Sequence, residues 1–226
     1  MNSNITKQFV AEFVGTFTLI FIGIGAIHHL GAVPGGLLGI ALAHGLAIAV
    51  MVSATGAISG GMLNPAVSFG VFIGGKMTFN RMLVYWVAQL GGGWLAAVLA
   101  GNLIAANGAN AADIIINGTP ALGKGVTIAA GIGIEAVLTF FLVFVVYGTA
   151  VDSRAPKIGG LAIGLTVALD ILFGGPLTGA AMNVARWFGP ALAAGNWANA
   201  IVYVAGPLIG GGLAGLVYGR FLIEQD

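Results

Sequence analysis

Cysteine is absent from the 226-residue sequence, and charged residues make up only 7% of it. The absence of cysteine excludes disulfide bonds and thiolate metal sites. An ordinary soluble domain carries about 25% charged residues, so this chain lacks the polar surface that a soluble fold must present to water. The eight Lys and Arg residues form no basic run, which leaves no sequence feature for binding nucleic acid. The composition therefore argues against a soluble protein.

Apolar residues dominate instead, at 58% of the chain, and the mean hydropathy is +1.03. A membrane-spanning helix needs about 20 predominantly apolar residues. The sequence predicts six such spans, at about Phe9–Leu30, Leu37–Ile58, Met82–Ala105, Val126–Tyr147, Leu161–Phe173 and Ala198–Leu222. Two further apolar pieces, about Asn64–Ile73 and Asn183–Ala194, are too short to cross, and each begins with Asn after a Gly-rich turn. We expect an all-α membrane protein with six transmembrane helices and two re-entrant half-helices.

The distribution of positive charge predicts how these spans are oriented. If the N-terminus is cytoplasmic, six basic residues fall on the cytoplasmic side: Lys7, Lys76, Arg81, Arg154, Lys157 and Arg220. Only Lys124 falls outside, and Arg186 lies within the second short piece. This distribution follows the positive-inside rule and predicts that both termini are cytoplasmic. The short termini and loops favour a plasma membrane.

The two halves of the chain repeat one another. Residues 11–21 share a Glu-x-x-x-Thr pattern with residues 134–144, and residues 59–70 share Asn-x-Ala and Phe-Gly with residues 178–189. We expect a single domain, 1–226, with repeat halves of about 1–115 and 116–226. Because each half holds an odd number of spans, the second half enters the membrane inverted. Inverted repeats with interrupted helices are typical of proteins with a substrate path near the bilayer midplane.

Two matched motifs lie at the short apolar pieces. They are Asn64, Pro65 and Ala66 in the first half, and Asn183, Val184 and Ala185 in the second. Together with the two Glu-x-x-x-Thr motifs, they resemble the signature of the aquaporin, or major intrinsic protein, family over essentially the whole chain. One such box is a weak signal, but two in opposite halves of a six-span repeat are specific. The resemblance implies a channel in the lipid bilayer, assembled as a homotetramer with one pore per subunit.

General physical chemistry also predicts a role for the two Asn residues. Each is expected to cap its half-helix and to point its amide N–H₂ into the pore. Two positive helix-dipole ends would then face the pore centre. A water bound by Asn64 and Asn183 would be oriented by both, which interrupts proton hopping, and the positive field would repel cations. Simple helix capping is the alternative. Val184 replaces a favoured first-turn proline at a cost of about 1 kcal/mol or less.

Arg186 is a charged residue at membrane depth, where charge is costly and marks a functional candidate. In the family, an arginine at this distance from the second Asn forms one wall of the outer selectivity filter. By position, the resemblance implies a filter of His44, Ile171, Ala180 and Arg186. Taken alone, His44 would more often be a core residue. The set resembles the filter of plant tonoplast intrinsic proteins and implies a wide constriction for water and small neutral solutes such as ammonia, urea or hydrogen peroxide.

Three acidic residues lie within predicted spans, where an unpaired carboxylate is expensive. The resemblance implies that Glu12 and Glu135 face inward and brace the re-entrant loops by accepting backbone N–H bonds. A proton relay is the alternative for these two. Asp170 neighbours Ile171 on the fifth span, and adjacent helical residues diverge by about 100°. We expect Asp170 to point away from the pore and hypothesise that it buttresses the filter.

The sequence thus predicts a passive channel for water and small neutral solutes that excludes protons and ions. A glycerol-type facilitator is one alternative, which Trp187 and Ala191 disfavour because such proteins have Asp and a basic residue there. A poorly conducting structural membrane protein is another. A secondary transporter would need titratable groups along its path, and only Arg186 is a charged candidate for the pore. No nucleophile–base pair, phosphate loop or metal cluster is present in the sequence, so we expect no enzyme activity and no cofactor.

Overall fold

The computed structural model describes residues 4–156 and 158–224. The described residues form helices and no strands: α1 (Ile5–Leu30), α2 (Gly36–Ser59), α3 (Pro65–Ile73), α4 (Phe79–Ile104), η1 (Ala105–Asn107), α5 (Ala111–Gly118), α6 (Ile128–Val146), η2 (Tyr147–Val151), α7 (Gly159–Thr178), α8 (Val184–Ala194), α9 (Ala200–Leu216) and η3 (Val217–Leu222). Among these, six helices are long and apolar enough to cross a membrane. The all-α fold with six spans and two half-helices is therefore confirmed.

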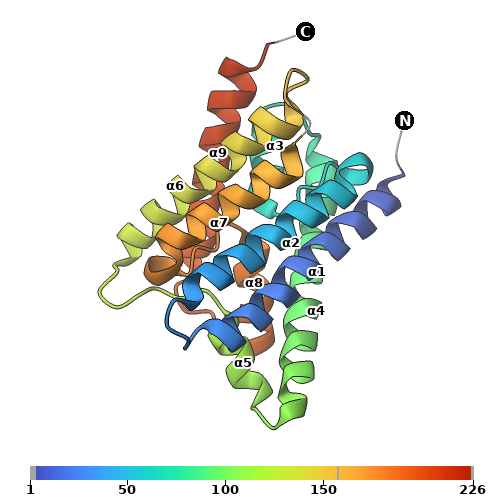
Figure 1. Ribbon diagram of the computed structural model, residues 1–226. Helices are drawn as coiled ribbons and strands as arrows, with labels where there is room; N and C mark the ends of the chain where they lie inside the picture. The colour runs from blue at the N-terminus through green and yellow to red at the C-terminus, as the bar shows by residue number, and fades with distance from the viewer. Residues whose placement is uncertain (1–3, 157, 225–226) are drawn as a thin grey trace.

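The six long helices form a bundle of two interlocked halves (Figure 1). In the first half α1 packs against α2 and α4, and in the second half α6 packs against α7 and α9. The halves join where α2 crosses α7. A Cβ atom placed on Gly45 of α2 would fall only 2.5 Å from the carbonyl oxygen of Gly164 on α7. Small residues at such crossings let two membrane helices approach backbone to backbone.

Each half-helix packs mainly against the opposite half of the chain. The first-half helix α3 lies on α9, and the second-half helix α8 lies on α4. Glycine again permits the contact, since a Cβ on Gly70 of α3 would lie 2.5 Å from the carbonyl oxygen of Gly211 on α9. The two re-entrant segments are therefore fixed in place by the bundle around them, which is the setting in which non-helical backbone is tolerated at membrane depth.

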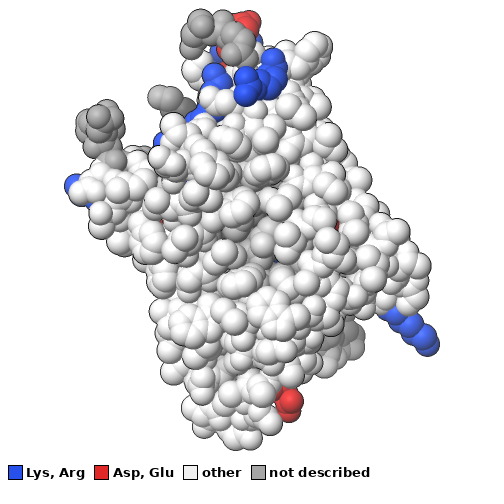
Figure 2. Space-filling model, turned by 180° about the vertical axis from the view of Figure 1, so that it is seen from behind, with Lys and Arg blue, Asp and Glu red and all other residues white. Residues whose placement is uncertain are grey.

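The start of α1 and the last turns of the chain lie at the same end of the bundle, and α5 lies at the opposite end (Figure 1). Contacts between basic residues and helix ends are consistent with this arrangement. Arg220 Nε donates to the carbonyl oxygen of Ile73, and Arg81 Nη2 donates to that of Ser59. Figure 2 shows Lys and Arg gathered mainly at this end, above a broad uncharged surface. Lys157, also placed on this side by the sequence, lies outside the described residues.

The segment between α4 and α6 contains the two-turn helix α5. Asn110 caps it by accepting from the backbone N–H of Ala112 at 2.9 Å. Ile114 and Ile115 are buried, and α5 packs against α1 and α4. The sequence analysis assigned no helix to this segment, because its apolar face is short and the surrounding residues are rich in Asn, Ala and Gly. The consequence is functional, because α5 ends at Gly118, which reaches the pore.

Candidate pore and its constriction

The two loops that lead into the half-helices have an uncommon backbone conformation. Leu63, Ala180 and Met182 all adopt left-handed φ values, at 51°, 44° and 50°. For a residue with a side chain this conformation costs about 1–2 kcal/mol. It persists only where surrounding contacts over-determine it. In both loops those contacts include a buried carboxylate.

Glu12 holds the first loop from α1. Its side chain is fully buried and accepts four hydrogen bonds, from Ser59 Oγ at 2.6 Å, Met62 N at 3.0 Å, Leu63 N at 2.6 Å and Gln89 Nε2 at 2.8 Å. One of these donors is the backbone of a residue with left-handed φ. Charge-assisted hydrogen bonds of this kind are about twice as strong as neutral ones. Four donors, three of them from the loop, thus converge on one carboxylate, which is the arrangement expected if Glu12 braces the loop that leads into α3.

Glu135 holds the second loop from α6 in the corresponding way. It is fully buried and accepts from Thr178 Oγ1 at 2.6 Å, Ala181 N at 2.9 Å and Met182 N at 2.7 Å. No counterpart of the Gln89 bond is found among the described residues. All the oxygens of both carboxylates are engaged with loop donors, an arrangement suited to support rather than to proton relay. The loop-bracing role itself remains a prediction.

A pair of tyrosines adds a second layer of symmetric support. Tyr85 donates its hydroxyl to the carbonyl oxygen of Ser59 at 2.6 Å, and Tyr203 donates to that of Thr178 at 2.9 Å. Both rings are fully buried. Ser59 and Thr178 occupy equivalent places before the two Asn boxes, so the inverted repeat extends to the residues behind the loops.

Asn64 and Asn183 are the N-caps of α3 and α8. The side-chain oxygen of Asn64 accepts from Ala66 N at 2.8 Å, and that of Asn183 accepts from Ala185 N at 2.9 Å. Each amide nitrogen also crosses to the opposite half. Asn64 Nδ2 donates to the carbonyl of Met182 at 2.8 Å, and Asn183 Nδ2 donates to that of Leu63 at 3.0 Å. Each N–H₂ group has two hydrogens, so one remains for the pore that both residues line.

Helix α8 begins at Val184 without the proline that starts α3. Asn183 still caps the helix, so the valine leaves the local geometry intact. We expect Val184→Pro to raise the stability by about 0.4–1 kcal/mol, because proline restricts the unfolded chain at a position whose backbone N–H is not needed. Osmotic water permeability should stay at the wild-type value. Thermal unfolding in detergent measures the stability, and stopped-flow shrinkage of proteoliposomes measures the water permeability. A marked loss of permeability would contradict the prediction that Val184 and proline are equivalent for conduction.

His44 and Arg186 form a buried hydrogen-bonded pair. His44 Nδ1 lies 2.8 Å from the carbonyl oxygen of Ile40, and a carbonyl can only accept, so Nδ1 carries the proton. Nε2 of the neutral ring is then the acceptor, and Arg186 Nε donates to it at 3.2 Å. Arg186 Nη1 donates to the carbonyl of Gly118 at 2.8 Å. The guanidinium is thus held on two sides, with Nη2 left as a donor.

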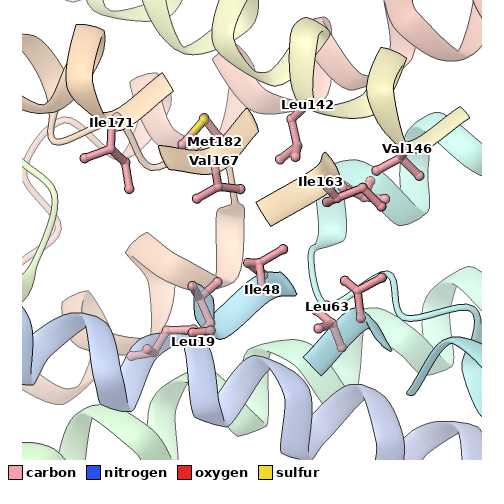
Figure 3. Close-up of a cluster of buried hydrophobic side chains, with 14 of the residues drawn as sticks. Leu19, Ile48, Leu63, Leu142, Val146, Ile163, Val167, Ile171 and Met182 are labelled. Atoms are coloured by element: carbon pink, nitrogen blue, oxygen red, sulfur yellow. The ribbon is translucent and has the colours of Figure 1, made fainter. Parts of the chain in front are cut away.

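The pore itself is a narrow, mostly apolar cavity of about 30 Å³. A single water needs about 10–15 Å³ measured in this way, so the space is large enough for water but for little more than two or three molecules at once. Figure 3 shows the buried hydrophobic side chains of this region, among them Leu19, Ile48 and Leu142, which face one another from different helices. Those that line the cavity include Leu19 of α1, Ile48 of α2, Leu142 and Val146 of α6, and Ile163 and Val167 of α7. Polar groups enter at Asn64, Asn183, His44 and Arg186.

A wider cavity of about 270 Å³ lies on the side of α5. His44, Ile171 and Arg186 line both this vestibule and the narrow pore. They therefore stand where the two spaces meet. Of these two spaces, Ala180 lines only the narrow pore. The structure therefore places all four predicted filter residues on the pore lining and three of them at its junction with the vestibule, with Arg186 and His44 supplying polar groups and Ile171 and Ala180 supplying apolar ones.

Sequence reasoning missed Gly118, whose carbonyl oxygen is the second anchor of Arg186. The group is backbone, and no side-chain pattern could have indicated it. Asp170 is buried, and its Oδ2 has no hydrogen-bond partner among the described residues. The structure therefore offers no bond from this oxygen to the filter, and the proposed buttress remains a prediction.

A six-span bundle with two capped half-helices meeting in an apolar pore defines a membrane channel. The major intrinsic protein family model matches residues 1–218, and the chain belongs to that family. It is similar to aquaporin TIP4-4 of Zea mays, with 44% identity over 97% of this chain and 88% of the relative. It is also similar to probable aquaporin TIP2-1 of Oryza sativa subsp. japonica, with 44% identity over 96% of this chain and 88% of the relative.

Among solved structures, the chain resembles an aquaglyceroporin from Plasmodium falciparum, with a TM-score of 0.85, 24% identity and 97% of each chain covered. At that identity the likeness shows the fold alone. The sequence-based resemblance to tonoplast intrinsic proteins is confirmed by the TIP relatives. The chain is a multi-pass membrane protein of a channel family that is not enzymatic.

Proposed function

We propose that the chain is a passive water channel that also passes small neutral solutes such as ammonia, urea or hydrogen peroxide, and excludes protons and ions. One observation carries this proposal. A narrow apolar cavity is interrupted by polar groups at two levels, the paired Asn amides and the His44–Arg186 pair. Apolar walls bind water weakly, and a few donors suffice to guide it through.

Proton exclusion is assigned to the meeting point of the half-helices. The N-termini of α3 and α8 both open at the pore, so their positive dipole ends face the same space. Asn64 and Asn183 each hold one amide hydrogen on the opposite loop, which fixes the direction of the other. A water between them would accept from both, and its own hydrogens would point outward along the pore. That orientation interrupts the chain a hopping proton requires.

Passage of solutes larger than water is assigned to the constriction. Ile171 and Ala180 present no hydrogen-bonding side chain, and Arg186 is drawn toward His44 and Gly118. Such an opening has one polar edge and one apolar edge, which suits small neutral molecules with both kinds of surface. A glycerol-type facilitator and a poorly conducting structural protein are the alternatives that the experiment decides.

We further propose a homotetramer with one pore per subunit and both termini cytoplasmic. The topology is supported by the basic residues gathered at the end where α1 starts and η3 ends (Figures 1 and 2). The plasma-membrane expectation finds no support in relatives that are tonoplast intrinsic proteins, so the proposal is limited to an integral membrane protein.

The test is stopped-flow light scattering of proteoliposomes, with water, ammonia, urea and glycerol flux measured on the same vesicles. Wild-type protein should give water flux well above that of empty liposomes, together with ammonia or urea entry. Ile171→Trp should bring all fluxes down toward those of empty liposomes, because the indole fills the constriction. Leu169→Trp is the matched control, since Leu169 lies on the same helix but is 66% exposed on the outer face.

Equal conduction by the two Trp variants would show that the path does not run through this level. Folded wild-type protein with no flux above empty liposomes would favour the structural alternative. Glycerol entry as fast as urea entry would favour the facilitator.

A further inference from the structure

An apolar groove runs along the outer face of the bundle between α3 and α9. It is lined by Phe69, Ile73, Leu208, Ile209, Gly212, Leu213 and Leu216, and has a volume of about 430 Å³. None of its lining residues belongs to the pore or its vestibule. The lining carries no polar side chain, so a segment of hydrocarbon fits it and a polar ligand does not.

Two features of the sequence create the groove. Helix α3 is a half-helix that ends at Ile73, so it covers only part of the length of α9. Gly212 then leaves a gap in the face of α9 between Ile209 and Leu216. Phe69 forms the nearest wall, since a Cβ added at Gly212 would lie 3.1 Å from its ring. The hollow is therefore built into the fold rather than left by one loose side chain.

Arg220 stands at the cytoplasmic end of the groove. It lies four residues after Leu216, which on a helix is one turn further on the same face. Its Nε donates to the carbonyl oxygen of Ile73, a groove residue, at 3.0 Å. Its guanidinium lies over the turn after α3, where a Cβ on Gly75 would be 3.3 Å from Cζ. Arg220 is exposed, and among the described residues no hydrogen bond from Nη1 or Nη2 is found, so both groups are available as donors.

The length of the groove fits one leaflet. From Leu208 to Leu216, the part of α9 that lines the groove, is eight residues, or about 12 Å at 1.5 Å per residue, and Arg220 lies about one turn further, in the π-helical η3. Half of the hydrocarbon core of a bilayer is about 15 Å. A hydrocarbon chain lying along α9 from the bilayer centre would therefore bring its headgroup to the level of Arg220.

Most of the described acidic residues are not placed to pair with Arg220 of a second copy of the chain. Their positions are all accounted for: Glu12 and Glu135 are bound to the pore loops, Asp170 is buried, Asp113 is on α5 at the other end, and Asp152 and Glu224 pair with Arg154. Glu224 lies at the same end but already pairs with Arg154, so an anion from the surrounding membrane is the complement that we consider for Arg220. The headgroups of the cytoplasmic leaflet supply negative charge at this level.

We propose that the groove between α3 and α9 is a binding site for an anionic phospholipid, with one acyl chain against Gly212 and the phosphate on Arg220. The guanidinium fork suits a phosphate through paired N–H donors. The bound lipid would fill the space beside α3 and so hold the half-helix from its outer side. The site is independent of solute passage, and its test does not depend on the pore being open.

The experiment is native mass spectrometry of the purified protein titrated with phosphatidylglycerol or with phosphatidylcholine of the same acyl chains. Wild-type protein should retain phosphatidylglycerol in preference to phosphatidylcholine. Arg220→Gln should weaken phosphatidylglycerol binding about fivefold, as expected for one basic residue near a headgroup, and leave phosphatidylcholine unchanged. Lys7→Gln is the matched control, because Lys7 is an exposed basic residue at the same end, on α1.

A second variant tests the groove rather than the charge. Gly212→Leu fills the hollow and should reduce the binding of both lipids, while Gly133→Leu should not, since Gly133 on α6 has no heavy atom within 4 Å of an added Cβ. Equal retention of both lipids by wild-type and Arg220→Gln protein would overturn the proposal. So would a Gly212→Leu protein that changes its oligomeric state with lipid binding unaltered, which would assign the groove to a second copy of the chain.

Discussion

Glu135→Ala is expected to leave little folded protein, and a channel that conducts poorly where it does fold. The substitution removes the acceptor for Thr178 Oγ1, Ala181 N and Met182 N at once. A buried donor left without a partner costs about 1–3 kcal/mol. The loop must also keep the left-handed φ of Ala180 and Met182 without the bonds that hold it. We expect a combined loss of about 3–5 kcal/mol, on the scale of breaking a buried charged network.

Glu135→Gln separates charge from hydrogen bonding at the same position. Its single amide oxygen can still accept from Thr178 and Ala181, but its N–H₂ group would face the N–H of Met182. The loss should therefore be smaller than for alanine, with the loop disturbed nearest to Asn183. The corresponding pair at Glu12 should rank in the same order, because both of its oxygens also accept from loop donors. Glu12 accepts one more side-chain bond, from Gln89.

Thermal unfolding in detergent and water permeability per folded molecule measure these effects. Glu224→Gln is the control, because that carboxylate is 79% exposed and its ion pair within the described part of the chain is with Arg154. Wild-type stability in Glu135→Ala would show that the loop conformation is held by the bundle alone. Water flux that fell equally in Glu224→Gln would point to a general effect of lost negative charge.

The parts of the fold that depend on composition and repeat pattern could be predicted from the sequence. Six spans follow from the apolar stretches, and the half-helices follow from Asn64 and Asn183 at the start of pieces too short to cross. The ends of the helices could be predicted less accurately from the sequence. Helix α4 begins at Phe79 rather than near Met82 because Thr78 caps it. Helix α7 runs through Pro176 to Thr178, beyond the expected Phe173.

The parts of the site that depend on backbone geometry could not be predicted. The sequence indicates that Glu12 and Glu135 face inward, but not that they hold residues with left-handed φ. It places His44 and Arg186 at one level through the family resemblance, but not the hydrogen bond between them. That bond depends on the Ile40 carbonyl, which fixes the His44 tautomer. Gly118 contributes only a carbonyl oxygen, so its role follows from where α5 ends.

Arg186→Val is expected to raise the ratio of urea and glycerol flux to water flux about tenfold. Valine removes the guanidinium from the wall of the constriction, so the opening widens beside Ile171 and Ala180. A tenfold change needs a barrier lower by only about 1.4 kcal/mol. His44 Nε2 and the Gly118 carbonyl lose their donor at the same time, which leaves two acceptors exposed to the path. The charge of Arg186 adds to the barrier at the ends of the two half-helices, so a measurable leak of protons or cations is also expected once that charge is gone.

Arg186→Lys distinguishes the shape of this side chain from its charge. Lysine keeps a positive charge but lacks the rigid fork that reaches His44 and Gly118 together. If the two contacts set the width of the constriction, Arg186→Lys should raise urea and glycerol flux nearly as much as valine does. If the charge excludes ions, the lysine variant should remain as tight to protons as the wild type, and only the valine variant should leak.

Both quantities come from one set of proteoliposomes, with solute entry followed by light scattering and proton entry by an internal pH dye under a set membrane potential. If the ratios of urea and glycerol flux to water flux were unchanged in both variants, Arg186 would not form part of the constriction. Equal proton leakage in the lysine and valine variants would show that ion exclusion depends on the hydrogen-bonded geometry of Arg186 and not on its charge. If neither variant leaked protons, the barrier to protons would lie at Asn64 and Asn183, where the N-termini of α3 and α8 meet.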